Sequence, residues 1–511
     1  MRRRHFLASL LATVVAACTR TSDELTDPTA TTSPTAEPEL EPTVLDAPTD
    51  TSLVVPTEPG VDPLPSPASP LGPNGFGFGV ASGDPDASSV VLWTRLVGDL
   101  PDSVDVVWEV SDTSSFDRLL ATGIESTSAA FGHSIHVVAD GLPPGSRWWY
   151  RFRSGDHVSP IGATRTLPDA ADTRPVRVGA SSCQLRETGY WAAHVDIANA
   201  DLDVFCWLGD YIYEGGGSSN LPDRAHTGDT ATTLDGYRHR YAEYRADPVL
   251  QASHAAHPWF CLWDDHEVEN DYDASVDPAR RAAAYQAWWE FMPVRLPAPD
   301  PSAPTYDIYR SLDLGERLRI VGVDVRQYAN ETTLFGEPQK QWIAEQLDAP
   351  TTWTLLASPV VASGIYTGEG EVLLPYTLDG HTDERRWLGD EFAKHDGRVI
   401  VSGDLHTSAV FEFSPDRRDV DSPVVATEFM APPISSQFPE RYAAAAGLLP
   451  LLNSHMAQFE PYNGWLLLSF DEQQLTAEYR RVTDVILVDS TVESAQRYQV
   501  ALGDPTPVPL D

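Results

Sequence analysis

Four short apolar runs in this chain each lead directly into a group of polar side chains, and this arrangement constrains the fold more than any other feature. The runs cover residues 176–180, 204–208, 259–263 and 399–402. The groups that follow them are Ser-Ser-Cys-Gln at 181–184, Gly-Asp-Tyr-Ile-Tyr at 209–213, Asp-Asp-His-Glu at 264–267 and Gly-Asp-Leu-His at 403–406. Ligands of open α/β sheets bind at the carboxyl ends of strands. We therefore expect the groups to meet at one edge of a sheet.

Residues 174–490 as a whole predict an α/β domain, because apolar β-like runs alternate with longer helical patterns. Further strands are expected at 318–323, 353–357 and 424–430, and helices at 234–244, 279–291 and 338–347. Residues 465–470 and 475–482 predict a hairpin that extends or covers a sheet edge. We expect residues 491–511 to form a C-terminal tail.

Residues 75–168 predict a separate small domain made of β-strands. Its β-like runs lie at 90–93, 104–110, 133–138 and 148–152, with turn signals between them. This spacing is typical of a β-sandwich. The turn Gly-Leu-Pro-Pro-Gly at 141–145, followed by an aromatic run, is similar to a region of fibronectin-type modules.

The segment before this domain predicts an export signal and a tether. Arginines at 2–4 precede an apolar run at 6–17 that is too short to span a bilayer. Residues 3–7 resemble a twin-arginine signal, and Val-Ala-Ala-Cys at 15–18 resembles a lipobox that would place a lipid anchor on Cys18. An ordinary cleaved signal with an incidental Cys18 is the alternative. Residues 19–74, rich in Thr, Pro and acidic residues, predict a disordered tether. We therefore expect an extracytoplasmic, membrane-anchored protein.

The charge balance excludes one class of partner. The chain carries 35 Lys and Arg residues against 75 Asp and Glu residues, a formal net charge of −40. Such a surface repels nucleic acid, so we expect no nucleic acid as a stable partner. Four cysteines are too few for a disulfide scaffold. Cys206 and Cys261 lie in apolar runs and are expected to be small buried side chains, although their spacing leaves a bridge between them open.

The polar groups at the strand ends combine carboxylates with a thiol, a phenol and an imidazole. Carboxylates that crowd together repel one another, and bound cations are the usual remedy. The combination therefore predicts a metal site.

The order of these groups resembles the metallophosphoesterase pattern of Asp-x-His, Gly-Asp, Gly-Asn-His-Glu and Gly-His-x-His. This chain differs at Cys183 in the first element, at Asp-Asp-His-Glu in the third, and at Asp404, which replaces a His in the last. These differences, together with the motifs at 79–85, 92–95 and 207–214, resemble the alkaline phosphatase D (PhoD) family over about residues 79–482.

The resemblance implies a fold and an activity. The fold is a metallophosphoesterase-type two-sheet αββα sandwich, of class α/β, preceded by the small fibronectin-like β-sandwich. The activity is exported alkaline phosphatase activity, which means phosphomonoesterase with phosphodiesterase activity and release of inorganic phosphate.

The family also implies a metal centre in which a ferric ion (Fe3+) is paired with calcium (Ca2+), as purple acid phosphatases also use ferric iron. Carried over onto this chain, Cys183, Asp210, Tyr213 and His406 would bind Fe3+. Asp210, Asp265 and Asp404 would bind Ca2+. Thiolate and phenolate are strong anionic donors for a trivalent ion, and an oxygen-only set suits a hard divalent one.

Three further residues have open roles. His266 is either a general acid or a hydrogen-bond donor to phosphate. Asn270 is either an additional oxygen ligand or a phosphate donor. Arg326 stands at a strand end, in a looser match to the family's Leu-Asp-Thr-Arg, and it either grips phosphate or forms a structural salt bridge.

Two other functions compete with phosphomonoesterase activity. One is a phosphodiesterase that acts on phospholipid or cell-wall polymer phosphates. The other is a display or ligand-binding module without catalysis, which would require degenerate polar groups at the strand ends. We expect a monomer.

Overall fold

The computed structural model describes residues 60–65, 71–72, 75–216, 219, 221–365, 374–417, 419, 421–439 and 446–510. The expected signal at 1–18 and nearly all of the expected tether at 19–74 lie outside the described residues. Within the described residues, no helix is both long and apolar enough to cross a membrane.

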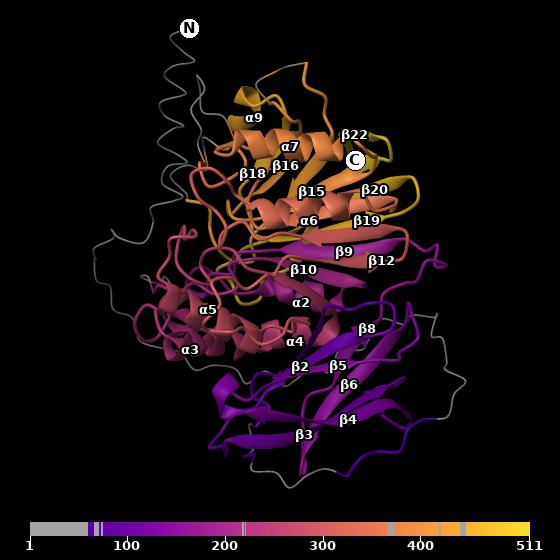
Figure 1. Ribbon diagram of the computed structural model, residues 1–511, viewed down its shortest axis with the longest axis vertical. Coiled ribbons are helices and arrows are strands. Elements are labelled where there is room, and N and C mark those ends of the chain that lie inside the picture. Colours follow the sequence, from indigo (N-terminus) through magenta and orange to yellow (C-terminus); the bar gives the residue numbers. More distant parts are fainter. Residues whose placement is uncertain are drawn as a thin grey trace.

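Two large sheets form the centre of the molecule (Figure 1). The ten-stranded sheet has the order β22-β21-β20-β19-β9-β10-β11-β1-β2-β5, and the seven-stranded sheet has the order β12-β13-β14-β15-β17-β16-β18. The ten strands are β1 (Val80–Gly83), β2 (Val90–Arg95), β5 (Ser134–Ala139), β9 (Val176–Ser181), β10 (Val204–Leu208), β11 (Pro258–Leu262), β19 (Gly464–Phe470), β20 (Gln474–Val482), β21 (Val492–Ala501) and β22 (Asp504–Leu510). The seven are β12 (Arg310–Leu314), β13 (Leu318–Gly322), β14 (Trp353–Ser358), β15 (Arg398–Ser402), β16 (Ser408–Phe413), β17 (Ala426–Met430) and β18 (Met456–Glu460).

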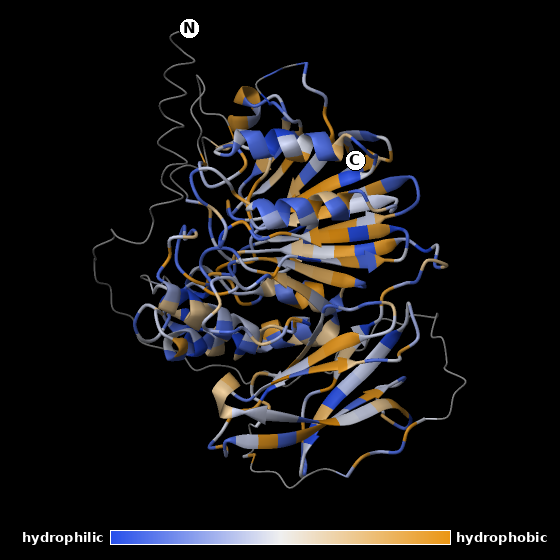
Figure 2. Ribbon diagram, viewed as in Figure 1, coloured by the Kyte–Doolittle hydropathy of each residue, from blue (hydrophilic) through white to orange (hydrophobic). Residues whose placement is uncertain are grey.

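Alternating side chains on these strands build two separate cores. Val399 and Val401 of β15 belong to the core between the sheets, whereas Ile400 faces the other way, into a core with the outer helices. Successive residues of a strand point to opposite faces, so a continuous apolar run fills both cores at once. This explains why the strands that lead to the polar groups contain almost no polar residue (Figure 2).

Helices cover both outer faces, which completes the four-layer αββα arrangement. Figure 1 shows α6 (Glu337–Leu347) and α7 (Thr382–Phe392) over the seven-stranded sheet, and α2 (Ala192–Asn199), α3 (Leu234–Arg245), α4 (Pro248–Ala256) and α5 (Pro278–Phe291) over the ten-stranded sheet. Within the described residues, the remaining helical segments are α9 (Leu449–Leu452), η1 (Ala129–Phe131), η2 (Arg186–Thr188) and η3 (Pro222–Arg224). The expected two-sheet sandwich is thereby confirmed.

The same sequence device begins two of these helices. An aspartate caps α4 and α5, and the next residue is a proline. Asp277 accepts hydrogen bonds from the backbone N–H groups of Ala279 and Arg280. The aspartate satisfies free N–H groups at the helix start, while proline at the first position has no N–H to leave unpaired.

The N-terminal β-sandwich shares a sheet with the larger domain. Its five-stranded sheet contains β3 (Ser103–Ser111), β4 (Leu119–Ser128), β6 (Arg147–Ser154), β7 (His157–Val158) and β8 (Gly162–Arg165). The facing strands β2 and β5 extend the ten-stranded sheet, because β1 pairs in parallel with β11. The sandwich that the sequence predicts is thus present, and it is joined to the larger domain by strand pairing.

Asp84, in the motif at 79–85, locks this junction. Its carboxylate accepts hydrogen bonds from Arg310 at 2.7 and 3.0 Å and from the backbone N–H of Arg295 at 2.8 Å. Asp84 is 2% exposed, and Arg310 also donates to the carbonyl of Cys261 in β11. The motif therefore holds the two domains together at a distance from the strand-end polar groups.

The C-terminal residues correct one expectation. Residues 491–511, for which the sequence predicts a tail, instead include β21 and β22 at the end of the ten-stranded sheet. The backbone carbonyl of Pro505 in β22 accepts a hydrogen bond from Thr427 of β17, at 2.5 Å. Three prolines in seven residues obscure the strand pattern of β22 in the sequence.

Two cysteines, on β10 and β11, behave as small apolar side chains. Cys206 and Cys261 lie on the neighbouring strands β10 and β11, and both are buried and free. The bridge that the spacing left open is not formed between these two described residues.

We predict that Asp84→Asn lowers the free energy of unfolding by about 3–5 kcal/mol, because it leaves the Arg310 guanidinium buried without its counter-charge. Urea unfolding checks this value. The matched control is Asp313→Asn, which removes the partner of Arg319 at a site where the aspartate is half exposed. That surface pair should cost less than about 1 kcal/mol. Equal losses in the two variants would contradict the role of Asp84.

Candidate metal centre

The polar groups meet at the carboxyl ends of strands, but these strands belong to two sheets and not to the one sheet that the sequence predicts: β9, β10 and β11 lie in the ten-stranded sheet and β15 in the seven-stranded sheet. The backbone turns sharply at these strand ends. The turns follow β9, β10 and β15, and four non-glycine residues in them have left-handed backbones: Cys183 (φ 52°), Asp210 (φ 56°), Asp404 (φ 73°) and His406 (φ 51°). Left-handed backbone is unfavourable for residues that carry a Cβ atom, and it persists where the surrounding structure fixes it. The fold holds these side chains at a local energetic cost.

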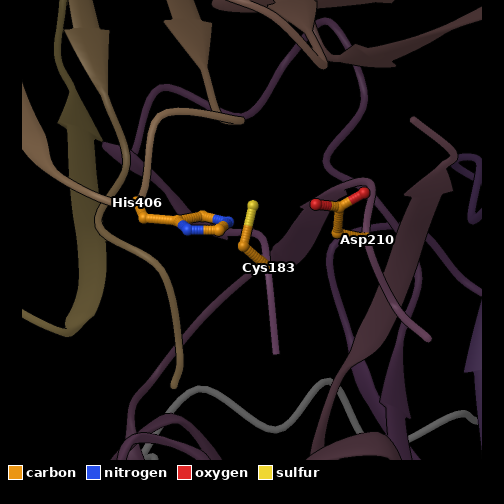
Figure 3. A group of neighbouring side chains, drawn as sticks. All are labelled: Cys183, Asp210 and His406. Atoms are coloured by element: carbon orange, nitrogen blue, oxygen red, sulfur yellow. The ribbon is translucent and has the colours of Figure 1, made fainter. Parts of the chain in front are cut away.

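One set of donors gathers around Asp210. The Cys183 thiol, the Asp210 carboxylate and a ring nitrogen of His406 lie within 4.8 Å of one another (Figure 3). The Tyr213 hydroxyl lies 3.0 Å from Oδ2 of Asp210 and 3.1 Å from Nε2 of His406. The structure thus brings together all four residues that the resemblance assigns to iron.

A second set shares Asp210 with the first. Ligand atoms of Asp210, Asp265 and His266 lie within 4.8 Å of one another. Burial, and then the charges of Asp264 and Asp265, raise the pKa of Asp404, which follows β15 of the facing sheet. Asp210 therefore lies between two groups of donors, as a bridging ligand must.

The pKa values of the donor side chains indicate that the cluster lacks positive charge. Burial, and then the charges of neighbouring carboxylates, raise the pKa of Asp210 and Asp404 and of the Cys183 thiol far above their usual ranges. Burial also raises the pKa of Tyr213 strongly, and it lowers the pKa of His406 to about 4. These groups cannot all be anionic together without added positive charge. The buried thiolate, phenolate, carboxylates and neutral imidazole fit a site for two cations.

His266 is held by a carboxylate behind it. Its Nδ1 lies 2.7 Å from Oε2 of Glu214, which is 7% exposed and also accepts the backbone N–H of Asn270 at 3.0 Å. The charges of Glu214, Asp265 and Asp210 outweigh burial and raise the pKa of His266 well above its usual value. Glu214 thus orients the His266 ring beside Asp210 and Asp265.

Arg326 forms the structural salt bridge, one of its two expected roles. Its side chain is 2% exposed, and Nε donates to Oδ1 of Asp264 at 2.5 Å. A second nitrogen lies 3.5 Å from Asp265. Burial raises the pKa of Asp265, but the charges of Arg326 and His266 outweigh it and hold that pKa at about 2. Arg326 therefore keeps a candidate ligand ionised.

The Asn270 amide contacts its neighbour Asp271. The side chain is exposed, and its Nδ2 donates to Asp271 at 2.9 Å. Its contribution in this structure is the backbone hydrogen bond to Glu214. Both roles expected of Asn270 from the sequence, an additional ligand or a phosphate donor, stay predictions.

Glu267 holds the turns in register, a role that sequence reasoning missed. Its carboxylate accepts the backbone N–H groups of Asp210, Tyr211 and Asp264 at 3.1, 2.6 and 3.0 Å. Glu267 is 1% exposed, so these bonds tie the turn after β10 to the turn after β11. Its place in Asp-Asp-His-Glu was the only sequence signal.

Tyr376 was also missed. Its hydroxyl donates to Oδ2 of Asp404 at 3.1 Å, and its ring lies 5.2 Å from the Arg326 guanidinium. Tyr376 thereby orients the candidate ligand Asp404. Its ring also packs against the guanidinium of Arg326, which pairs with the candidate ligand Asp265. No motif around residue 376 indicated this position.

Comparison with known proteins decides the family. Residues 178–479 match the model of the PhoD-like phosphatase family, and residues 64–168 match the model of its N-terminal domain. The chain belongs to the PhoD-like phosphatase family. These matches lie close to the two folded domains that the sequence predicts.

Individual relatives agree with this assignment. The chain is 34% identical over 451 residues to alkaline phosphatase D of Bacillus subtilis (strain 168), covering 79% of this chain and 77% of the relative. A solved structure of PhoD superposes with a TM-score of 0.80 at 30% identity, covering 88% of this chain and 94% of that one. A purple acid phosphatase from yellow lupin (Lupinus luteus) seeds shares the fold, with a TM-score of 0.57 at 12% identity over 83% of this chain and 74% of that one. The chain is therefore an alkaline phosphatase D-like hydrolase of phosphate esters.

We predict that Glu267→Gln weakens metal retention by roughly 10- to 100-fold, the usual effect of losing a residue that orients metal ligands. The amide replaces an acceptor oxygen with a donor that faces backbone N–H groups. Metal content after dialysis against graded chelator measures the effect. Glu384→Gln is the control, because Glu384 also accepts buried backbone N–H groups, at Leu334 and Phe335, but lies on α7. Equal metal loss in both variants would contradict the assignment.

Proposed function

We propose that this protein is an exported, metal-dependent phosphatase that cleaves phosphate monoesters, also has phosphodiesterase activity, and releases inorganic phosphate. The observation that carries the proposal is the convergence of Cys183, Asp210, Tyr213 and His406 beside Asp265 and Asp404, on strand ends of a two-sheet sandwich. Membership of the PhoD-like family supports the reaction class.

We assign Fe3+ to Cys183, Asp210, Tyr213 and His406, and Ca2+ to Asp210, Asp265 and Asp404. The donor types support this division, since thiolate and phenolate suit a trivalent ion and carboxylates suit a hard divalent one. When bound, the two cations supply electrostatic stabilisation of the charge on the phosphoryl oxygens.

The side chains of this protein do the remaining work. Glu214 occupies Nδ1 of His266, which leaves Nε2 as the nitrogen that can donate a proton to the leaving oxygen of the ester. Arg326 and Tyr376 keep Asp264, Asp265 and Asp404 in place, and Glu267 fixes the turn that carries Asp210. In this proposal, Asp210 and His266 are the catalytic residues. Arg326 is a positioning residue that holds Asp264 and Asp265.

The cellular setting is part of the proposal. The basic start and apolar run at 1–17 support twin-arginine export, and Cys18 supports a lipid anchor on the outer side of the membrane. The composition of residues 19–74 supports a tether between that anchor and the folded domains. The protein acts there as a monomer on small phosphate esters.

We predict that the purified chain hydrolyses p-nitrophenyl phosphate and bis-p-nitrophenyl phosphate, and that a chelator abolishes both activities. Release of p-nitrophenol gives both rates, and their ratio assigns the monoester or diester preference. A dominant diester rate would favour the alternative of phospholipid or cell-wall polymer phosphates. Bound metal without turnover on either ester would contradict the proposed activity.

We predict that Asp210→Asn reduces turnover to background and lowers metal content without unfolding the chain. The substitution keeps the size of the side chain but removes the charge that both cations require. Metal analysis, circular dichroism and p-nitrophenol release are the measurements. The exposed Asp229→Asn serves as the control and should retain full activity. Full activity of Asp210→Asn would refute the assignment.

We predict that Cys183→Ala removes iron or bleaches the visible band expected from Tyr213 bound to iron. Absorption spectra and iron content of wild type and variant, at equal protein concentration, are the measurements. Cys261→Ala, at a buried free cysteine inside β11, is the matched control. An unchanged spectrum and unchanged iron content would make Cys183 an ordinary core residue.

A further inference from the structure

The segment at 431–437, which follows β17, lies against the turn that carries Cys183. The backbone N–H of Ile434 donates to the carbonyl of Ser182 at 3.0 Å, and that of Ser436 donates to the carbonyl of Cys183 at 3.1 Å. These bonds join a segment that follows a strand of the seven-stranded sheet to a turn that follows β9 of the ten-stranded sheet. The segment therefore has a fixed position beside the candidate iron site.

Ser436 of this segment brings a hydroxyl group to the Tyr213 oxygen. Its Oγ lies 2.7 Å from the Tyr213 hydroxyl oxygen, and Ser436 is 1% exposed. The backbone N–H of Leu185 donates to the same Oγ at 3.0 Å. The backbone carbonyl of Ser436 also accepts a hydrogen bond from the side-chain amide of Asn463 at 2.8 Å. Contacts with the protein thus hold both the side chain and the backbone of Ser436.

The hydrogen bonds around Tyr213 decide which of the two hydroxyl groups is the donor. A phenol carries one O–H group and can donate one hydrogen bond. Tyr213 donates to Oδ2 of Asp210 at 3.0 Å. The hydrogen atom between Tyr213 and Ser436 therefore comes from Ser436. A Tyr213 oxygen that binds a cation as phenolate has no hydrogen atom to offer, so Ser436 is the donor in that case as well.

Tyr213 also lies against the side chain that we propose as the proton donor. The ring centroids of Tyr213 and His266 are 4.1 Å apart, and the ring planes are inclined by 34°. A contact that fixes the Tyr213 oxygen also fixes its ring, and thereby one face of the His266 ring. Hydrogen bonds to the Tyr213 oxygen therefore affect both the candidate iron site and the neighbouring imidazole.

We propose that Ser436 is a positioning residue of the metal centre, whose hydroxyl donates a hydrogen bond to the Tyr213 oxygen and directs that oxygen toward the candidate iron site. This inference rests on the proposed function and adds a residue to the same site. The hydrogen bond draws electron density from the Tyr213 oxygen, and so sets how strongly this oxygen donates to a cation. Residues behind the ligands orient and tune metal sites in this way.

The neighbouring Ser435 offers a matched comparison. Ser435 is also buried, at 0% exposure, and belongs to the same segment. Its hydroxyl, however, donates to the carbonyl of Leu185 at 2.8 Å and accepts the indole N–H of Trp191 at 3.0 Å. The two serines therefore agree in burial and in place along the chain, and they differ in what their hydroxyl groups contact.

The test compares the visible absorption band of the full chain, loaded with ferric iron, with those of Ser436→Ala, Ser435→Ala and Ser436→Thr at equal iron content. Without the hydrogen bond the Tyr213 oxygen is a stronger electron donor, so the band of Ser436→Ala should shift to longer wavelength. Its kcat on p-nitrophenyl phosphate should fall about 10-fold, as expected for loss of a residue that orients a metal ligand. Ser435→Ala should keep the wild-type band and kcat, and Ser436→Thr, which retains a hydroxyl, should restore both.

A wild-type band in Ser436→Ala would overturn the proposal, and so would a shifted band with wild-type kcat. An equal shift in Ser435→Ala would overturn it as well, because the effect would then come from the packing of the segment. A shift that persists in Ser436→Thr would have the same consequence. Absence of the visible band in the iron-loaded wild type would instead refute the assignment of Tyr213 to iron, which belongs to the proposed function.

Discussion

The packing of buried acidic donors around Asp210 is the constraint on which the rest of the structure depends. Burial and mutual repulsion raise the pKa of Cys183, Asp210 and Asp404, so the cluster is electrostatically incomplete without cations. Its geometry is also unfavourable locally, because both aspartates and the cysteine have left-handed backbones. The two-sheet sandwich provides the support that such a cluster requires. Apolar strands with filled cores on both faces fix the strand ends from which the donors project.

Three carboxylates stabilise this centre through contacts with other residues of the protein. Glu267 binds backbone groups of two turns, Glu214 holds one nitrogen of His266, and Asp264 pairs with Arg326. Each of these three carboxylates has a structural role, and the candidate ligands and His266 have the chemical roles. The same separation applies to the N-terminal domain, where the family motif around Asp84 joins strands and domains and contributes no donor to the centre. Some sequence motifs in this protein therefore mark contacts between domains, and others mark the residues of the candidate metal centre.

Much of the fold could be predicted from the sequence, because the apolar runs are short, continuous and bounded by polar groups. Strands β9 and β10 begin at the expected residues, and helix α3 ends within one residue of its expected end. His406 follows β15 of the other sheet, but the convergence of Cys183 and Tyr213 was also predictable, since the paired parallel strands β9 and β10 bring their carboxyl ends together. The choice between the roles of Arg326 was not, because the distance from Val325-Arg326 to Asp264 depends on how two sheets pack. Glu267 and Tyr376 were missed because backbone hydrogen bonds and ring contacts leave no spacing pattern in the sequence.

The C-terminal strand β22 closes the exposed end of a sheet of ten strands. A proline has no backbone N–H to donate, and β22 contains Pro505, Pro507 and Pro509. A strand from another molecule that approached this end would find few donors with which to pair. The last strand of the sheet thus limits the addition of strands from neighbouring molecules at this end of the sheet.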